Sequence, residues 1–455
     1  MSVHARTVAA STPSAARGEN QAKQQQKQQT ELNPRTTTRE FLGAPGAAAI
    51  IVICHAVLYA FYTNCTEDGC PNAQGLAWLV QSPFNFPSGW QSAYHRLGLQ
   101  VYVGWLSWLL GLYCLVPGRW VRGTVLRNGT TLEYKVNALS ALVLTALGCA
   151  AGLYFAGPEP FVFVYDHILH VITAGIIIAS VLSVYLYTAS FLPGKLLALG
   201  GNSGNPLYDF FIGRELNPRI GSFDFKYFIE LRPGLIGWQV LNFCSAVKQY
   251  ATHGYLTDSM VMVQVFQLWY VFDSLSNEAS VLTTMDVTTD GLGWMLTFGN
   301  LCLVPFGFSL QTRYLAAHPN DLGLLKMAGI LMLQAFGYWI FRSANSQKDR
   351  FRKNPEDPSV KHLSYISTKR GTRLITSGWW GYARHVNYFG DWIMGIAWCL
   401  PCGMSSIIPY FYCLYFTALL IHRERRDEHM CHLKYGGDWR RYRRIVPWRI
   451  IPYVY

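Results

Sequence analysis

Long apolar segments recur through most of the chain, and they restrict its fold more than any other feature. An α-helix needs roughly 20 mainly apolar residues to cross the hydrocarbon core of a bilayer. The strongest candidate segments are residues 45–64, 97–118, 136–157, 170–191, 260–272, 322–341 and 403–421. The same length rule brings the predicted total to about ten once weaker segments are added, near residues 233–247, 294–316 and 388–402. We therefore expect an all-α fold, a polytopic transmembrane helical bundle.

The composition favours a membrane protein over a large soluble one. Hydrophobic residues make up 51% of the chain and charged residues only 14%, against roughly 25% charged in average soluble domains. The net charge is +12, and the basic residues gather between apolar segments, at 118–127, 342–373 and 422–449. Because Lys and Arg beside spans are typical of cytoplasmic loops, we place the loop 118–135 and the C-terminal end in the cytosol and the loop 65–95 on the other side. Nucleic-acid binding is not expected, since the membrane also explains the interleaved aromatic residues.

The N-terminal segment differs from the rest of the chain. Residues 1–40 are rich in Ala, Ser, Thr and Gln and hold almost no large apolar residues, which predicts a disordered cytoplasmic tail. The segment lacks the apolar region of a cleaved secretory signal. We expect residues 41–455 to form the transmembrane domain.

The 11 cysteines lie mostly in apolar segments, where a buried thiol usually has a structural role. Their spacing contains no zinc-type pattern, so no metal site is predicted. Cys65 and Cys70 share the loop that we place on the non-cytosolic side, where they either form a disulfide or remain free thiols.

Polar residues that do not suit a lipid-facing helix concentrate near the C-terminus. The segment GWWGYARHVNYFGDW carries Arg384, His385, Asn387 and Asp391 among aromatic residues, within roughly two helical turns. A charged group at membrane depth costs roughly 2 kcal/mol or more and usually lines a cavity. A single histidine here would be explained as a hydrogen-bonded core residue, but four polar groups together predict a ligand site.

Two further polar clusters flank this segment. In ANSQKDRFRK, Lys348 and Arg352 are four positions apart and share a helical face, although alone they would suit a cytoplasmic anchor. In LLIHRERRDEHMCHLKYG, Arg423 and Asp427 are also four apart, so they either pair with each other or bind a ligand.

Together these clusters predict a cofactor pocket mainly within residues 342–455. Arg and Lys match phosphate oxygens, and Trp379, Trp380 and Tyr435 could stack on a flat ring. That combination suits a dinucleotide phosphate such as NADPH. The chain has no P-loop and no GxGxxG sequence, so the site would not be Rossmann-like.

A second group of polar residues, within WYVFDSLSNE, indicates a proton donor. Tyr270, Asp273 and Asn277 fall near one helical face by their three- and four-residue spacing, and Glu278 follows directly. A buried phenol beside an acid can protonate an apolar substrate. The alternative is that the tyrosine only forms hydrogen bonds within the bundle.

Three long motifs resemble the signatures of the membrane sterol reductases. They are GNPLYDFFIGRELNPRIG (204–221), LITSGWWGYARHVNYFGDW (374–392) and LLIHRERRDEHMCHLKYG (419–436). The resemblance extends from about residue 40 to the end of the chain. Within the family, residues 277–315 and the ending VPWRIIPYVY are most similar to the fungal delta-14 branch.

The resemblance implies a protein of about ten helices in the endoplasmic reticulum membrane, with a cofactor site open to the cytosol, that uses NADPH to saturate a sterol double bond. Lys348 and Arg352 would hold the cofactor phosphates, and Tyr270 and Asp427 are the implied proton donors. The residues implied to surround the rest of the cofactor are Trp380, Arg384, His385, Asn387, Asp391, Arg423 and Tyr435. Expected partners are the sterol substrate and membrane lipids, with other sterol-biosynthesis enzymes as candidates.

The chemistry of an 8,14-diene sterol sets the requirements for such a site. No carbonyl activates the diene, so protonation at carbon 15 must first give an allylic cation at carbon 14, which hydride from NADPH then traps. A phenol of ordinary pKa near ~10 is a weak acid for this step. A neighbour such as Glu278, Asp273 or Asp427 is therefore expected to assist.

Three alternatives remain open. Other members of the family reduce the 7,8 or the 24(28) bond. An isoprenylcysteine-type methyltransferase also places its cofactor in C-terminal helices, but it has no need of Lys348 and Arg352 as phosphate ligands. A non-catalytic sterol-binding scaffold of the nuclear envelope, like the C-terminal domain of the lamin B receptor, would not require the intact run of polar residues.

Overall fold

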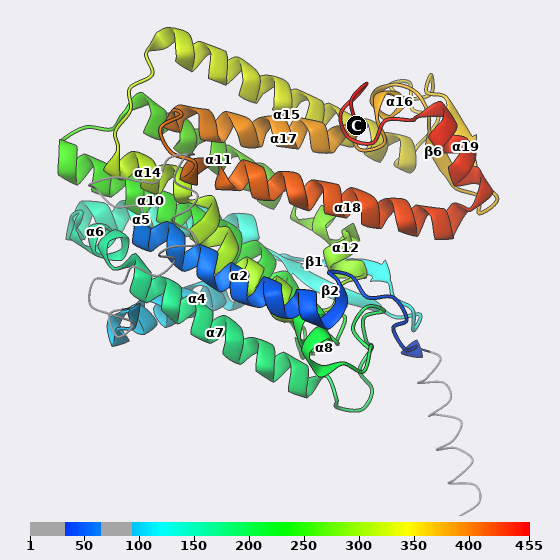
Figure 1. Ribbon diagram of the computed structural model, residues 1–455, viewed down its shortest axis with the longest axis horizontal. Coiled ribbons are helices and arrows are strands. Elements are labelled where there is room, and N and C mark those ends of the chain that lie inside the picture. Colours follow the sequence, from blue (N-terminus) through cyan, green and yellow to red (C-terminus); the bar gives the residue numbers. More distant parts are fainter. Residues whose placement is uncertain (1–31, 65–92) are drawn as a thin grey trace, which may run out of the picture.

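The structure, a computed structural model, describes residues 32–64 and 93–455, and most of them are helical (Figure 1). Within this part of the chain, five helices are long and apolar enough to cross a membrane. They are α2 Gly43–Asn64, α4 Arg96–Leu115, α5 Ala138–Ala156, α7 Ile168–Ala189 and α15 Leu324–Lys353. These helices confirm the helical, multi-span part of the prediction, whereas the total of about ten spans stays a prediction.

Two of the weaker predicted spans are helices interrupted at a proline. Pro233 and Pro305 each lie in a π-helical turn, because proline lacks an N–H and displaces the carbonyl four residues before it. The two turns pack against each other within the bundle, where an interrupted helix is tolerated. The segments are α9 Phe225–Ile229, η3 Glu230–Gly234 and α10 Leu235–His253, then α13 Trp294–Phe298, η5 Gly299–Gly307 and α14 Leu310–Ala317.

The C-terminal half contains α11 Asp258–Ser276, α17 Val386–Cys399 and α18 Phe411–Tyr435 in addition to α15. The predicted span 403–421 begins later than expected. Pro401, Gly403 at φ +70° and Pro409 prevent one continuous helix. Two short turns, η6 Leu400–Cys402 and η7 Ile408–Tyr410, stand before α18, which then continues through the charged segment to Tyr435.

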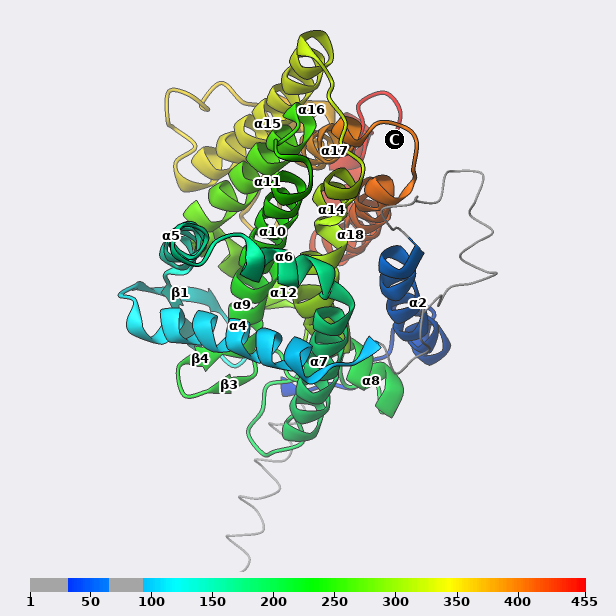
Figure 2. The ribbon, with the colours of Figure 1, turned by 90° about the vertical axis from the view of Figure 1, so that its left-hand side faces the viewer.

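Helix α15 packs lengthwise along α17, and two glycines permit the close approach. A Cβ at Gly337 would lie 2.8 Å from the carbonyl oxygen of Gly390, and a Cβ at Gly390 would lie 2.7 Å from that of Gly337. Small residues at such crossings are typical of membrane helices. This group, with α18, lies on the opposite side of the bundle from α4 and α7 (Figure 2).

The described residues also include three small antiparallel two-stranded sheets, which the prediction of a helical bundle did not contain. In the largest, Asn128 and Gly129 (φ +78°) lie in the turn between the two strands, where the Gly129 N–H donates to the Leu126 carbonyl at 2.9 Å. The strands are β1 Arg119–Val125 with β2 Thr131–Val136, β3 Arg219–Ile220 with β4 Phe223–Asp224, and β5 Tyr365–Ser367 with β6 Arg373–Ile375. The shorter helices are α6 Glu159–Asp166, α8 Pro206–Ile212, η4 Glu278–Thr283, α12 Met285–Thr288, α16 Trp379–Tyr382 and α19 Gly437–Ile445.

Part of the segment predicted as a tail is held against the loop that follows α7. The Asn33 amide donates to the Lys195 carbonyl and accepts from the Leu197 N–H, both at 2.9 Å. The Thr36 N–H donates to the Asn202 carbonyl at 3.0 Å. The remainder of the predicted tail, residues 1–31, lies outside the described residues, as does the predicted choice between disulfide and thiols at Cys65 and Cys70.

Candidate active site

A cavity is lined by residues of α15 and α18, of the hairpin β5–β6 and of the short helices α16 and α19. Figure 1 shows where these elements meet. The volume of the cavity is ≈ 580 Å³, within the range of roughly 300–1,000 Å³ typical of cofactor sites. Seven predicted site residues line it: Lys348, Arg352, Trp380, Arg384, His385, Asp427 and Tyr435. The wall also contains Met285, Thr289, Phe351, Arg370, Arg373, Leu374, Ile375, Met430, Cys431, Leu433, Lys434, Trp439 and Tyr442.

The cavity wall is strongly cationic. Lys348 and Arg352 reach it from one face of α15, as their spacing predicted, and Arg370 and Arg373 reach it from the hairpin β5–β6. Among the described lining residues, Asp427 is the one acidic side chain. This excess of Lys and Arg over carboxylates is the chemistry that binds phosphate.

Aromatic rings stand beside these cations. The Lys348 ammonium lies 3.9 Å from the ring centroid of Trp380, a cation–π contact. The indole N–H of Trp380 donates to the Ala344 carbonyl at 3.0 Å and fixes the buried ring. Tyr435 and Trp439, which also line the cavity, are stacked with a distance of 6.3 Å between their ring centroids. The wall thus offers both charge and flat apolar surface.

His385 and Asp427 face each other in the cavity, with His385 Nε2 at 3.5 Å from Asp427 Oδ2. Burial, together with the positive charges of Lys348 and Arg384, lowers the pKa of His385 to about 3. Burial raises the pKa of Asp427, and Lys348 opposes that rise. The imidazole is therefore neutral at physiological pH, so the contact is not an ion pair and Lys348 is the main counter-charge of Asp427.

Arg384 reaches the cavity but is mainly engaged with the C-terminal segment. Its Nη1 donates to the carbonyls of Val446 and Pro447, both at 2.9 Å, and its Nη2 lies 3.6 Å from Glu428 and 4.0 Å from Glu424. The side chain is buried. These contacts attach the end of the chain to the start of α17.

The four polar residues of the segment 378–392, which were predicted to form one ligand site, do not all line the cavity. Helix α16 ends at Tyr382, and Ala383 is extended (φ −153°, ψ 154°) before α17 begins at Val386. The break separates the set: Arg384 and His385 line the cavity, whereas Asn387 and Asp391 lie within α17 and do not line it.

Deeper in the bundle, the Tyr270 hydroxyl lies next to the Asp391 carboxylate. The Tyr270 ring packs edge-on against Trp398 at 5.0 Å. Among the described residues, Asp391 Oδ1 and Asn387 Oδ1 are buried without a hydrogen-bond donor. Because unsatisfied buried acceptors are costly, these oxygens are candidates to contact a ligand.

The predicted partners of Tyr270 lie elsewhere. Asp273 accepts a hydrogen bond from Tyr338 at 3.2 Å and pairs with Arg342 at 3.5 Å. Asn277 donates to the Asp273 carbonyl at 2.8 Å and caps the end of α11. The shared helical face therefore did not bring these residues to the phenol.

Glu278 belongs to a separate buried cluster. Its carboxylate accepts from the Ala138 N–H at 2.7 Å, from the Tyr227 hydroxyl at 2.7 Å and from Arg232 Nη2 at 3.2 Å. Arg232 also donates to Asn137 Oδ1 at 2.6 Å. Helix α11 ends at Ser276, and the turn η4 carries Glu278 away from Tyr270.

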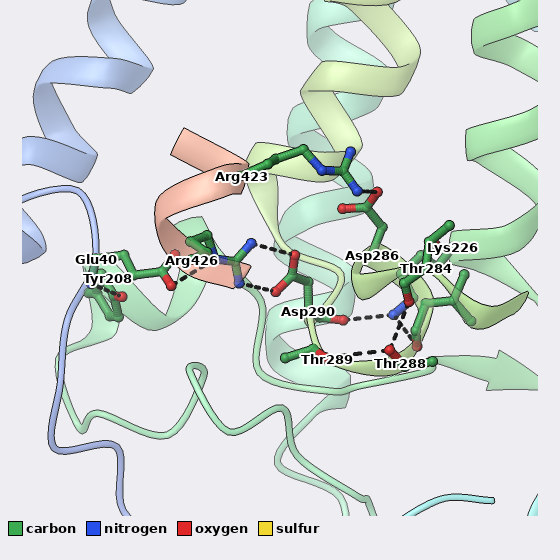
Figure 3. A network of polar contacts seen from close by, with 11 residues as sticks. Glu40, Tyr208, Lys226, Thr284, Asp286, Thr288, Thr289, Asp290, Arg423 and Arg426 are labelled. Carbon is green, nitrogen blue, oxygen red and sulfur yellow. Dashed lines mark hydrogen bonds and ion pairs between the residues drawn. The ribbon is translucent and has the colours of Figure 1, made fainter. Parts of the chain in front are cut away.

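Helix α18 is fastened to the loop of α12 and to the N-terminal segment by two arginines (Figure 3). Arg423 Nη2 lies 3.0 Å from Asp286, so it does not pair with Asp427 on its own helix. Arg426 contacts Asp290 at 2.6 and 3.0 Å and Glu40 at 2.8 Å. These contacts hold one wall of the cavity in place, because the α12 segment supplies wall residues.

A buried lysine, Lys226, also holds the loop of α12 in place. Lys226 donates to the carbonyls of Leu216, Val287 and Asp290 at 2.7, 3.1 and 2.7 Å; Figure 3 shows the contact with Asp290. Three neutral acceptors satisfy the three N–H groups of the ammonium. Sequence reasoning did not identify this lysine or Asp286, Asp290, Arg370 and Arg373, because no local spacing connects them to the cavity.

Comparison with known proteins places the chain among sterol enzymes. The family model described as the ergosterol biosynthesis ERG4/ERG24 family matches residues 36–455. A Delta(14)-sterol reductase of Schizosaccharomyces pombe is 50% identical, over 91% of this chain and 97% of the relative. The Delta(14)-sterol reductase of Mus musculus is 46% identical over 91% and 97%. That of Candida albicans is 41% identical over 94% and 99%.

Proposed function

The chain belongs to the ergosterol biosynthesis ERG4/ERG24 family, and from that premise we propose that it reduces the 14,15 double bond of 8,14-diene sterols with NADPH. Relatives that span nearly its whole length are named Delta(14)-sterol reductases. The observation that carries the cofactor assignment is the cationic, aromatic-walled cavity beside α15 and α18.

The donor set of the cavity fits a phosphorylated dinucleotide. Lys348, Arg352, Arg370 and Arg373 would hold its phosphates, because Lys and Arg supply charge-assisted N–H donors to phosphate oxygens. The aromatic rings around Trp380 would cover its flat groups. Asn387, Asp391 and Arg423 do not line the cavity, so their predicted contacts with the cofactor would require it to reach beyond the cavity into the bundle. NADPH bound there would supply the hydride that ends on carbon 14 of the sterol.

The chain itself must deliver a proton to carbon 15 and keep water away from the cation that forms on the sterol. Tyr270 is the proposed donor, with Asp391 as the adjacent acid that shares its proton. This assignment replaces the expectation that Glu278, Asp273 or Asp427 assists the phenol. Asp427 is proposed to act on the cofactor side, where it faces His385 and Lys348.

We propose that Glu278 has a structural role only, since its three hydrogen bonds all serve the cluster around Arg232. The proposed location is the endoplasmic reticulum membrane, with the cavity in contact with the cytosol. The basic residues around the cavity support that orientation by the positive-inside rule.

The test is turnover of a defined diene. Purified full-length protein in nanodiscs is incubated with an 8,14-diene sterol and NADPH, and the products are separated by gas chromatography with mass detection. Parallel samples contain NADH or no cofactor. The proposal predicts the 8-ene product with NADPH. Reduction of a 7,8 or 24(28) double bond instead would assign another branch of the family, and bound but unreduced diene would indicate a scaffold.

A further inference from the structure

A second polar cavity lies at the end of α7, apart from the proposed cofactor site. Its volume is ≈ 760 Å³. As far as the structure describes the two walls, they have no residue in common. The wall of this second cavity draws on the end of α7, the loop before α8 and the N-terminal segment.

The cavity opens at the expected surface of the membrane. Helix α7 is a candidate span ending at Ala189, and the cavity wall includes Tyr187 in its last turn and Ser190, Phe191 and Leu192 directly after it. The side chains of Phe191 and Leu192 are 60% and 59% exposed. Large apolar side chains exposed at the end of a span are suited to contact the lipid beside a headgroup layer.

The charges in the wall favour an anion. The positive charge of Lys195 is compensated by Glu215, since Lys195 Nζ lies 2.9 Å from Glu215 Oε1. Asp209 is 3% exposed, and its two oxygens accept the backbone N–H groups of Ser203 and Gly204 at 2.9 and 3.0 Å. Two guanidinium groups, those of Arg35 and Arg214, remain without a carboxylate partner among the described residues.

The Arg214 guanidinium lies beside the apolar rim of the cavity, which Phe191 and Leu192 form. It lies 4.0 Å from the ring centroid of Phe191, and it donates to Ser190 Oγ at 3.4 Å and to Asn202 Oδ1 at 3.3 Å. Both acceptors are neutral and both distances are long for a hydrogen bond. Since a guanidinium has five N–H donors, most of its donor capacity is available to a ligand.

Arg35 approaches the same loop from the N-terminal segment. Gly204 has φ +80°, and a Cβ there would lie 2.4 Å from Arg35 Nη1. The glycine therefore makes room for the guanidinium over the loop. The hydrogen bonds of Asn33 and Thr36 to that loop fix the backbone on both sides of Arg35.

We propose that this cavity binds the phosphate headgroup of an anionic phospholipid, held by Arg35 and Arg214. Arginine recognises phosphate through paired N–H donors, and basic pockets at the ends of membrane helices take anionic headgroups. Phe191 and Leu192 would contact the start of the acyl chains. Free phosphate would use the same two arginines but gain nothing from the apolar rim.

The test measures lipid retention by the full chain in nanodiscs that contain phosphatidylcholine with a minor fraction of phosphatidylinositol. The nanodiscs are exchanged into detergent, and the retained lipid is counted by native mass spectrometry. The wild type should retain phosphatidylinositol over phosphatidylcholine, and Arg35→Gln/Arg214→Gln should lower that retention about tenfold or more. Arg122→Gln is the matched control, because Arg122 is an exposed arginine on the hairpin β1–β2 that does not line the cavity.

Two results would overturn the proposal. The first is equal phosphatidylinositol retention by the wild type and the double variant, provided that both give the same elution volume and melting temperature in phosphatidylcholine alone. The second is stabilisation by inorganic phosphate equal to that by phosphatidylinositol, which would make this a site for a soluble anion. The readout does not involve sterol reduction, so it is independent of the proposed function.

Discussion

Replacing Glu278 with alanine should destabilise the protein, because the carboxylate is the counter-charge of a fully buried arginine. The side chains of Arg232 and Glu278 are 0% and 1% exposed and lie 3.2 Å apart. Removing one partner of such a pair leaves a buried charge uncompensated, at a cost of roughly 3–5 kcal/mol. The Ala138 N–H and the Tyr227 hydroxyl also lose their acceptor, which places the expected loss toward the upper end of that range.

The assay is the melting temperature in detergent, followed by the fraction of protein that remains monodisperse on size-exclusion chromatography after heating. Glu278→Ala should melt roughly 3–8 °C below the wild type. Glu133→Ala is the matched control, because it breaks an ion pair at the surface. The side chains of Arg122 and Glu133 are 79% and 57% exposed. Such exposed pairs contribute about 0–1 kcal/mol, so this variant should melt near the wild type.

A double variant separates charge burial from lost packing. Arg232→Met/Glu278→Leu removes both charges and should recover part of the stability lost in Glu278→Ala. The structural role of Glu278 would be refuted if Glu278→Ala kept the wild-type melting temperature but lost sterol reduction. That result would return the carboxylate to the list of catalytic candidates.

Three further predictions concern the proposed site. Tyr270→Phe should lower kcat for the diene by roughly 10²–10⁴-fold with the KM for NADPH unchanged, and a wild-type kcat would exclude the phenol as donor. Arg384→Gln should lower stability by about 2–4 kcal/mol and speed proteolysis after residue 445; unchanged melting and cleavage would show that its contacts with Val446 and Pro447 are dispensable. Burial keeps the pKa of His385 at about 3 in the folded protein, whereas the pKa of an unfolded histidine is near ~6.5. Between these two pH values the unfolded state binds more protons than the folded state. The free energy of unfolding therefore falls as the pH drops below ~6.5, by up to ~1.4 kcal/mol per pH unit. The melting temperature of His385→Gln should therefore fall less than that of the wild type between about pH 7 and pH 5; parallel curves would contradict the neutral buried imidazole.

Spacing along one helix was a sound guide for Lys348 and Arg352, but not for Tyr270 and Asp273. Lys348 and Arg352 lie on one face of α15 and reach the same cavity, as their four-residue spacing predicted. The same rule was incomplete for Arg423 and Asp427, since it left open whether they pair with each other. Arg423 pairs with Asp286, and Asp427 lies beside His385 with Lys348 as its main counter-charge.

Other features depended on contacts that local patterns do not encode. Arg384 and His385 lie in the non-helical break before α17 and line the cavity, whereas Asn387 and Asp391 lie within α17. The turn after Ser276 separates Glu278 from Tyr270 despite their closeness in sequence. Arg426 meets Glu40 across nearly the whole length of the chain. Such pairings follow from packing of distant elements, which a single sequence does not specify.

The most direct test of the cofactor site is the affinity for NADPH of the double variant Lys348→Met/Arg352→Gln, measured by titration calorimetry on protein in nanodiscs. Lys353→Met is the control on the same helix, since Lys353 is 75% exposed, pairs with Asp349 and does not line the cavity. Loss of two charge-assisted contacts should weaken NADPH binding roughly 100-fold or more, with the control near wild type. A monodisperse elution peak in size-exclusion chromatography shows that the double variant is folded. Wild-type NADPH affinity in the folded double variant would contradict the assignment of this cavity to the cofactor.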